Sequence, residues 1–355
     1  MHSESLLARR QQSMGSAYRL FYDEPVHIVR GEGVWLYDSE GRKYLDMYNN
    51  VPHVGHCHPR VVEAICEQAG KLNTHTRYLH ENVVTLAERL TAKLPDGLDT
   101  AMFCCTGSEA NELALRIARR CTGGTGIIVT DFSYHGNTQA IHEISTDTIP
   151  AADVPDYVVT VPAPDTYRGR HQGDDAGRRY AEYARAAIAT LEQRGIKLAA
   201  LVIDTIVSSS GVVAPPVGYL GAVAEIVRDA GGLFIADEVQ PGFGRTGRNF
   251  WGFEADGLVP DIVTMGKPMG NGHPLSAVVA RSELVREFAK HGRYFNTFGG
   301  NPVSCAAGLA VLDVIEDERL QQNALDVGTH LCDGLHTLAE THECIGDVRG
   351  SGLFL

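Results

Sequence analysis

The stretch LFIADEVQ, residues 233–240, is a short apolar run that stops at Asp237. A run of this length, bounded by charge, is typical of a strand that is buried on both faces. Two similar runs precede it and also end in an aspartate, at Asp131 and Asp204. Helical patterns separate the runs, near residues 178–194 and 219–230. The alternation predicts an α/β fold, in which βαβ units build a mainly parallel sheet with helices on both faces.

The ends of these runs carry the chain's most informative polar residues. Ligands of open parallel sheets bind beyond the carboxyl ends of the strands. Asp131, Asp204 and Asp237 occupy such ends, and Lys267 ends a fourth apolar run, residues 261–267. We therefore expect the four side chains to converge on one crevice.

A lysine and an aspartate at neighbouring strand ends suit the chemistry of pyridoxal phosphate. The amine of Lys267 can form a Schiff base with an aldehyde cofactor. The carboxylate of Asp237 can keep a pyridine nitrogen protonated, so that the ring accepts electrons. The pair predicts an enzyme in which Lys267 and Asp237 are catalytic.

The composition argues against several classes of binding partner. The 355 residues are 44% hydrophobic and 21% charged, the balance of a globular protein with a large core. The net charge of -13, without a Lys/Arg block, argues against nucleic acid or an anionic membrane as partner. No apolar run approaches the ~18 residues that cross a bilayer, and residues 1–10 lack a signal-peptide pattern. We expect a cytoplasmic protein that binds a small molecule, with its eight scattered cysteines reduced.

The sequence TGSEAN, residues 106–111, leads into a segment with the apolar spacing of an amphipathic helix. A helix that starts here presents free backbone N–H groups, which bind phosphate, with Gly107 allowing close approach and Ser108 adding a hydroxyl. The alternative is an ordinary capping box of Thr106 and Glu109. Taken alone, the motif favours the capping box.

An aromatic residue, Tyr134, follows the run that ends at Asp131. A flat cofactor ring needs a stacking partner on one face and an apolar side chain on the other, which Tyr134 and Val239 can supply. Gln240 is placed to hydrogen-bond a ring hydroxyl. For an isolated aromatic residue at a strand end, core packing is the more common role.

Two other motifs give weaker evidence about function. The run HVGHCHP, residues 53–59, contains three histidines, but its spacing fits no standard zinc pattern, so we expect a structural loop and no metal. The glycine-rich residues 123–126 lack the Lys-Ser/Thr of a nucleotide-binding loop and predict a turn into the next strand.

The two ends of the chain differ from its middle. Residues 34–46 have the pattern of a two-stranded hairpin, and residues 303–340 that of a long helix followed by a second helical stretch. Residues 345–355 predict the start of a new strand, so we expect an incomplete chain. The domain boundaries follow from these patterns. They are an N-terminal segment of a small domain at 1–55, a large cofactor-binding domain at 56–302 and the start of a C-terminal part of the small domain at 303–355.

Over nearly its whole length the sequence resembles the class III aminotransferase family, the fold type I group of pyridoxal phosphate enzymes. The matching motifs are GHCHP at 55–59, GSEAN at 107–111, YHG at 134–136, ADEVQ at 236–240, GFGRTG at 242–247, GK at 266–267 and TFGGNP at 297–302. The resemblance implies a mainly parallel sheet of the seven-stranded type and a smaller α+β domain. It also implies pyridoxal 5'-phosphate as the cofactor and an amine as the substrate.

The resemblance assigns roles to individual positions. Lys267 resembles the Schiff-base lysine and Asp237 the partner of the pyridine nitrogen. The remaining expected cofactor contacts are Gly107, Ser108, Tyr134, His135, Asp204, Val239, Gln240 and Thr297. Thr297 resembles a threonine that reaches the cofactor phosphate of the neighbouring subunit, which implies a homodimer with sites at its interface.

Within the family, several segments look most like the phospho-lyases, which eliminate phosphate from ethanolamine phosphate or phosphohydroxylysine. Their resemblance suggests Asn50, Val51 and Tyr78 as substrate contacts. Transfer of the amino group to a keto acid is the alternative reaction, and a catalytically silent cofactor-binding protein is a third. Asp204-Thr205 departs from the family, where a glutamate and a small residue are common. The chain also stops before the region of the carboxylate-binding arginine of many aminotransferases.

Overall fold

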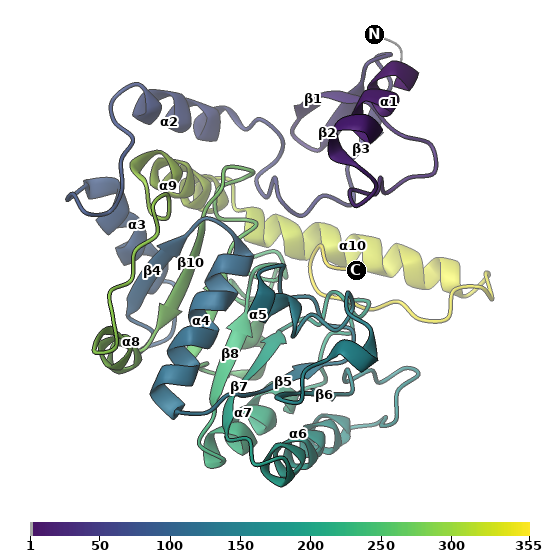
Figure 1. Cartoon of the computed structure of the whole chain (residues 1–355). Helices are drawn as coiled ribbons and strands as arrows, with labels where there is room; N and C mark the ends of the chain where they lie inside the picture. Colours follow the sequence, from purple (N-terminus) through teal and green to yellow (C-terminus); the bar gives the residue numbers. More distant parts are fainter. Residues whose placement is uncertain (1–2) are drawn as a thin grey trace.

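A seven-stranded mixed sheet forms the centre of the computed structural model, which describes residues 3–355 (Figure 1). Its order is β4-β10-β9-β8-β7-β5-β6, and β10 is antiparallel to both of its neighbours while the other pairs are parallel. The mainly parallel sheet is therefore confirmed. The strands are β4 (Thr100–Cys104), β5 (Gly126–Thr130), β6 (Val158–Val161), β7 (Leu198–Asp204), β8 (Leu233–Asp237), β9 (Ile262–Met265) and β10 (Ser276–Ala280).

Helices cover both faces of this sheet, because the central strands are apolar on both sides. One face packs against α4 (Gly107–Thr122), α5 (Gln139–His142) and α8 (Ser282–Ala289). The other packs against α2 (Pro59–Ala69), α3 (Glu81–Thr91), α6 (Ala176–Gln193), α7 (Tyr219–Asp229) and α9 (Pro302–Asp317). Short 3-10 turns lie at Ala151–Asp153 and Gly252–Asp256.

A separate antiparallel sheet lies near the N-terminus, at the top of Figure 1. The predicted hairpin is confirmed as β2 (Trp35–Asp38) and β3 (Lys43–Leu45). A third strand, β1 (Ile28–Glu32), pairs with β2 and was not predicted, because its residues are mostly exposed and lack an apolar face. Helix α1 (Ser3–Met14) precedes this sheet.

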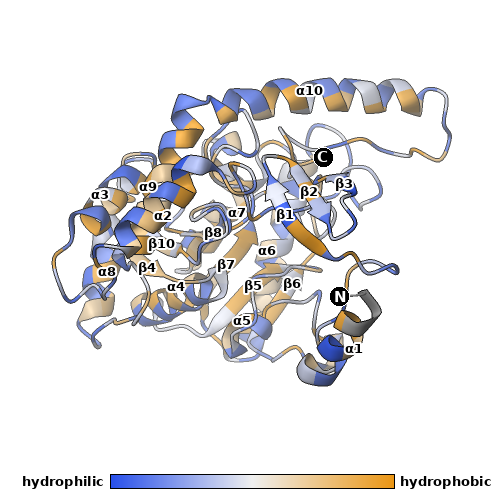
Figure 2. Cartoon of the chain, turned by 90° about the horizontal axis from the view of Figure 1, so that it is seen from above, coloured by the Kyte–Doolittle hydropathy of each residue, from blue (hydrophilic) through white to orange (hydrophobic). Residues whose placement is uncertain are grey.

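The last part of the chain is helical. The predicted helices are confirmed as α9 and α10 (Leu320–Ala339). Helix α10 is amphipathic but mostly exposed, and in Figure 2 it carries both hydrophobic and hydrophilic colours, whereas β5 and β7 are largely hydrophobic.

The predicted strand at 345–355 is wrong. The structure has no strand there, only an isolated bridge between Ser351 and Phe354. Gly352 has a φ of 58°, which bends the backbone away from an extended path. The segment instead hydrogen-bonds to the loop after β8, where Leu353 N donates to Arg245 O at 3.1 Å.

Candidate active site

Three of the four predicted strand-end residues lie together. Asp204 and Asp237 are direct partners across β7 and β8, and Lys267 follows the neighbouring strand β9. The fourth, Asp131, does not join them through any contact within residues 3–355. Its backbone carbonyl accepts a hydrogen bond from Ser210 Oγ at 2.9 Å.

The carboxylate of Asp237 is buried in a network of donors. Its Oδ2 accepts from Asn111 Nδ2 at 2.9 Å and lies 2.7 Å from His135 Nδ1, while Oδ1 accepts from the backbone N of Val239 at 3.1 Å. Thr264 Oγ1 in turn donates to Asn111 Oδ1 at 2.6 Å. The network fixes the orientation of the Asp237 carboxylate.

Sequence reasoning missed Asn111 and Thr264. Asn111 lies inside the quoted motif GSEAN and is 2% exposed on an otherwise apolar face of α4. A polar residue at a core position of an amphipathic helix is the signal that could have identified it. Thr264 offers no such signal, because a threonine inside an apolar strand is common.

The amine of Lys267 is easier to deprotonate than that of an ordinary lysine. Burial lowers the pKa of Lys267, the negative charges of Asp237 and Asp204 oppose this shift, and the positive charge of Arg245 adds to it. A lysine with a depressed pKa is a competent nucleophile and proton acceptor near neutral pH.

The N-terminus of α4 confirms the capping box and also has backbone N–H groups outside it. Thr106 Oγ1 accepts from Glu109 N at 3.2 Å, and Glu109 Oε2 accepts from Thr106 N at 3.1 Å. The backbone N–H groups of Gly107 and Ser108 have no partner within residues 3–355. A Cβ on Gly107 would lie 2.9 Å from Cγ1 of Val239, so only glycine fits this close approach.

Tyr134 and Val239, the predicted ring sandwich, differ in burial. Tyr134 is 38% exposed and is therefore not a core residue, while Val239 is 7% exposed and packs on Gly107. His135, predicted as a cofactor contact, is buried and contacts Asp237. Its Nε2 has no hydrogen-bond partner within the described part of the chain.

Gln240 links the strand ends to the N-terminal segment. Its Oε1 accepts from Asn50 Nδ2 at 2.5 Å, and its Nε2 donates to Ser208 Oγ at 2.7 Å. Ser208 Oγ then donates to the carboxylate of Asp204. The chain of bonds fixes the orientation of the Gln240 amide and brings Asn50, a predicted substrate contact, to the site.

The structure explains the threonine of Asp204-Thr205, where a glutamate and a small residue are common in the family. Thr205 Oγ1 donates to Oε1 of Glu238 at 2.6 Å, and the backbone N groups of Gly252 and Phe253 also donate to that carboxylate. Glu238 is fully buried, and burial raises its pKa to about 8. The hydroxyl of Thr205 therefore satisfies a buried group that the sequence did not reveal.

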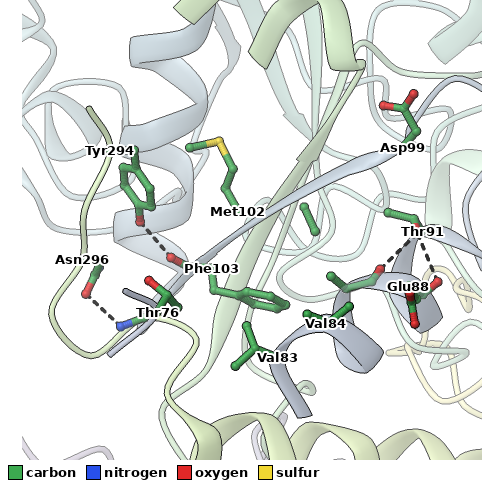
Figure 3. A pocket seen from close by; sticks show the side chains of 13 residues that line it. Thr76, Val83, Val84, Glu88, Thr91, Asp99, Met102, Phe103, Tyr294 and Asn296 are labelled. Atoms are coloured by element: carbon green, nitrogen blue, oxygen red, sulfur yellow. Dashed lines mark hydrogen bonds between the residues drawn. The ribbon is translucent and has the colours of Figure 1, made fainter. Parts of the chain in front are cut away.

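Val51, Tyr78 and Thr297, the other predicted contacts, form no hydrogen bond or ring contact with Lys267 within residues 3–355. Val51 is partly buried, and Tyr78 is 65% exposed with its ring stacked on His75 at 5.2 Å. Thr297 is exposed on the loop before α9. Residues of that loop, with α3 and β4, line a separate cavity of about 430 Å³, in which Tyr294 donates to Phe103 O at 2.8 Å (Figure 3).

The histidine loop has structural partners. His56 Nε2 lies 2.7 Å from Asp46 Oδ2, His58 Nε2 lies 3.0 Å from Glu318 Oε1, and His53 Nε2 lies 2.8 Å from Phe243 O. The described residues contain no group of three or more side chains that could hold a metal ion. The glycine-rich turn is confirmed, since Gly123 ends α4 with a φ of 68° before β5.

Known proteins match this chain along almost its full length. The family model "Aminotransferase class-III" matches residues 21–355. The chain belongs to this family. A solved phospholyase from Arthrobacter, in complex with phosphoethanolamine, is 46% identical with a TM-score of 0.94, over 98% of this chain and 82% of that one.

Two relatives by sequence carry different names. "Alanine--glyoxylate aminotransferase 2-like" of Drosophila melanogaster is 46% identical over 98% of this chain and 72% of its own length. "Ethanolamine-phosphate phospho-lyase homolog 1" of Caenorhabditis elegans is 43% identical over 99% of this chain and 79% of its own length. No helix within residues 3–355 has the length and apolar character needed to span a membrane.

Class III aminotransferases bind pyridoxal 5'-phosphate, and the residues of this site fit that cofactor. The buried carboxylate of Asp237 suits a protonated pyridine nitrogen, and the depressed pKa of Lys267 suits an aldehyde partner. Gly107 and Ser108, at the N-terminus of α4, offer free N–H groups for the phosphate. The protein is therefore a pyridoxal phosphate-dependent enzyme, either a phospho-lyase or a transaminase.

Proposed function

We propose that this enzyme is a phospho-lyase, which releases phosphate from an O-phosphorylated amino alcohol such as ethanolamine phosphate. The main support is the likeness to the Arthrobacter phospholyase, at 46% identity and a TM-score of 0.94. That structure holds phosphoethanolamine, and the match covers nearly all of this chain. The named Caenorhabditis elegans relative supports the same reaction.

The side chains of the site have clear tasks in this reaction. Lys267, whose pKa is lowered by burial, takes a proton from the substrate carbon that bears the amine. The bound cofactor supplies an electron sink for the electron pair left on that carbon. Asp237 holds the charge that this sink requires. Phosphate leaves from the adjacent carbon, and hydrolysis of the remainder gives an aldehyde and ammonia.

The test is to supply ethanolamine phosphate to the purified holoenzyme without any keto acid and to assay free phosphate. We expect repeated turnover, with equal amounts of phosphate and ammonia. The Lys267→Ala variant should release neither above background. Lack of turnover by the wild-type enzyme would contradict the proposal.

Transamination is the second candidate, because the Drosophila relative carries an aminotransferase name at 46% identity. Its distinguishing result is turnover that requires pyruvate or another keto acid together with an amine donor, without release of phosphate. A cofactor-binding protein without activity would show neither reaction.

We further propose a homodimer whose partner subunit supplies Thr297 to the site. The apolar side chains near this residue support it, since Phe298 is 70% exposed and Leu79 is 99% exposed. Side chains of this kind on neighbouring loops are typical of an interface. A cytoplasmic location stays a prediction.

A further inference from the structure

A second cavity, lined by arginines, lies at the C-terminal end of α4, opposite to the end that carries Gly107. It has a volume of about 480 Å³ and is formed by the last two turns of α4, the turn into β5, and the end of α8 with the loop after it. Helices α4 and α8 lie side by side in the lower left part of Figure 1. None of its lining residues that the structure describes is acidic, and the basic ones are Arg116, Arg119, Arg120, His291 and Arg293.

The four arginines of this cavity have no carboxylate partner. Within residues 3–355 none of them forms an ion pair, and two of them lie over aromatic rings instead. The guanidinium of Arg116 is 5.6 Å from the ring of Phe288, and that of Arg119 is 5.2 Å from the ring of Tyr157. The buried Nε of Arg119 has no hydrogen-bond partner in the same part of the chain. A chain with a net charge of -13 therefore concentrates unpaired positive charge in one hollow.

The acidic residues closest to these arginines along α4 and α8 have other partners. Glu112 accepts a hydrogen bond from Thr138 Oγ1 at 2.8 Å. Glu287 pairs with Lys290 at 2.6 Å and lies 3.5 Å from His291 Nε2. The histidine of the cavity accordingly has a carboxylate beside it, whereas the arginines do not.

The arginines at the end of α4 also have a purely structural role. Basic residues in the last turn of a helix offset its dipole, and Arg119 and Arg120 occupy that turn. This role does not account for Arg116, which lies a turn earlier, or for Arg293, which belongs to the loop after α8. Like charges that line one hollow repel one another, and an anion that binds among them relieves the repulsion.

We propose that this cavity binds a small anion with at least two phosphate groups, such as pyrophosphate or the diphosphate of a nucleotide. Guanidinium groups bind phosphate oxygens through paired, charge-assisted hydrogen bonds. Four positive charges exceed the about two negative charges of a single phosphate group, which favours a ligand with more than one. The volume is within the usual range for small-molecule sites. Because the cavity is separate from the crevice of Lys267, the proposal does not depend on which reaction the enzyme catalyses.

The test is calorimetric titration of the cofactor-saturated holoenzyme with inorganic pyrophosphate and, separately, with ADP. We expect one site per chain and no change in the visible absorbance of the cofactor. Equal affinity for the two ligands would assign recognition to the phosphates alone, and tighter binding of ADP would assign it to a nucleotide. Absence of saturable binding, or an absorbance change that saturates together with the heat, would overturn the proposal.

Two variants identify the site. Arg120 and Arg293 are exposed and come from different segments, so Arg120→Gln and Arg293→Gln should leave the fold intact. Each should weaken binding by about 10-fold, the effect of one charge-assisted hydrogen bond. Arg178→Gln, at an exposed position of α6, is the matched control and should bind as the wild type does. Wild-type affinity in both cavity variants, or an equal loss in the control, would contradict a site in this cavity.

Discussion

Lys267 shows how a reactive residue costs stability. Its pKa is lowered by burial, so the folded chain binds this proton less readily than the unfolded chain does. Below the unfolded pKa of about 10.4 the lysine therefore opposes folding, by about 1.4 kcal/mol for each unit of depression. The penalty shrinks as the pH rises toward that value.

The first prediction follows at this residue. In cofactor-free protein, Lys267→Met should raise the free energy of unfolding at pH 7, on the order of 1 kcal/mol, because it removes a desolvated amine. The gain should be smaller at pH 9.5. Urea denaturation at both pH values measures it, with Lys290→Met, an exposed position, as control. A gain that does not vary with pH would show that packing, and not charge, is responsible.

Single residues were predictable where a reaction requires a particular chemical group. Lys267 and Asp237 stood at strand ends, and the structure brings them together. The hydrogen bond of Arg245 to Asn50 O could not be predicted, because it joins two segments far apart in the sequence. Asp131 ends an apolar run, as Asp204 does. The sequence could not show that the two residues have different neighbours in the structure.

At the scale of elements, the start of α4 combines two tasks. The capping box of Thr106 and Glu109 satisfies N–H groups at the helix end, and Cys105 N also donates to Glu109 Oε2 at 2.7 Å. The same end presents Gly107 and Ser108 toward the crevice. We therefore expect the stability of the helix end and the binding of the cofactor phosphate to be coupled.

The second prediction concerns this cap. Thr106→Ala should lower the free energy of unfolding by about 1 kcal/mol, the usual cost of a lost N-cap. It should also weaken cofactor retention, measured as loss of visible absorbance on dialysis. Thr106→Ser keeps the hydroxyl and should behave as the wild type in both assays. If Thr106→Ala loses stability but retains the cofactor fully, the coupling is refuted.

Helices and strands were predictable where their apolar residues show which side of the element is buried. The strands β5, β7 and β8 and the helices α6, α7, α9 and α10 follow the predicted pattern closely. The antiparallel direction of β10 was not predicted, because pairing direction depends on the connection and not on the strand's own residues. The segment 345–355 is apolar in part, but its glycines adopt turns in the absence of a pairing strand.

At the scale of the molecule, the exposed apolar loops suggest how two chains meet. Phe298 follows Thr297 directly in the loop before α9 and is 70% exposed, and Leu79 lies just before α3 and is 99% exposed. An exposed Phe gains most from burial when it fills a pocket of a partner.

The third prediction tests this interface. The wild-type protein should sediment at twice the 38.5 kDa mass of the chain. Phe298→Asp should shift it toward the monomer and reduce cofactor retention, because Thr297 would no longer reach the neighbouring site. Val217→Asp, at a position 88% exposed elsewhere, is the control and should leave the mass unchanged. A monomeric wild-type protein would contradict the dimer.

The order of the strands in the sheet also determines when each strand can pair with its neighbour during synthesis on the ribosome. Strand β4 has only β10 as neighbour, and its partner residues, Ser276 opposite Cys104, emerge much later. At about 5–20 residues per second, β4 waits roughly 10–30 s for that partner. Throughout this interval its apolar residues have no strand to pair with, so this edge of the nascent chain stays exposed for longer than in a protein whose neighbouring strands are consecutive.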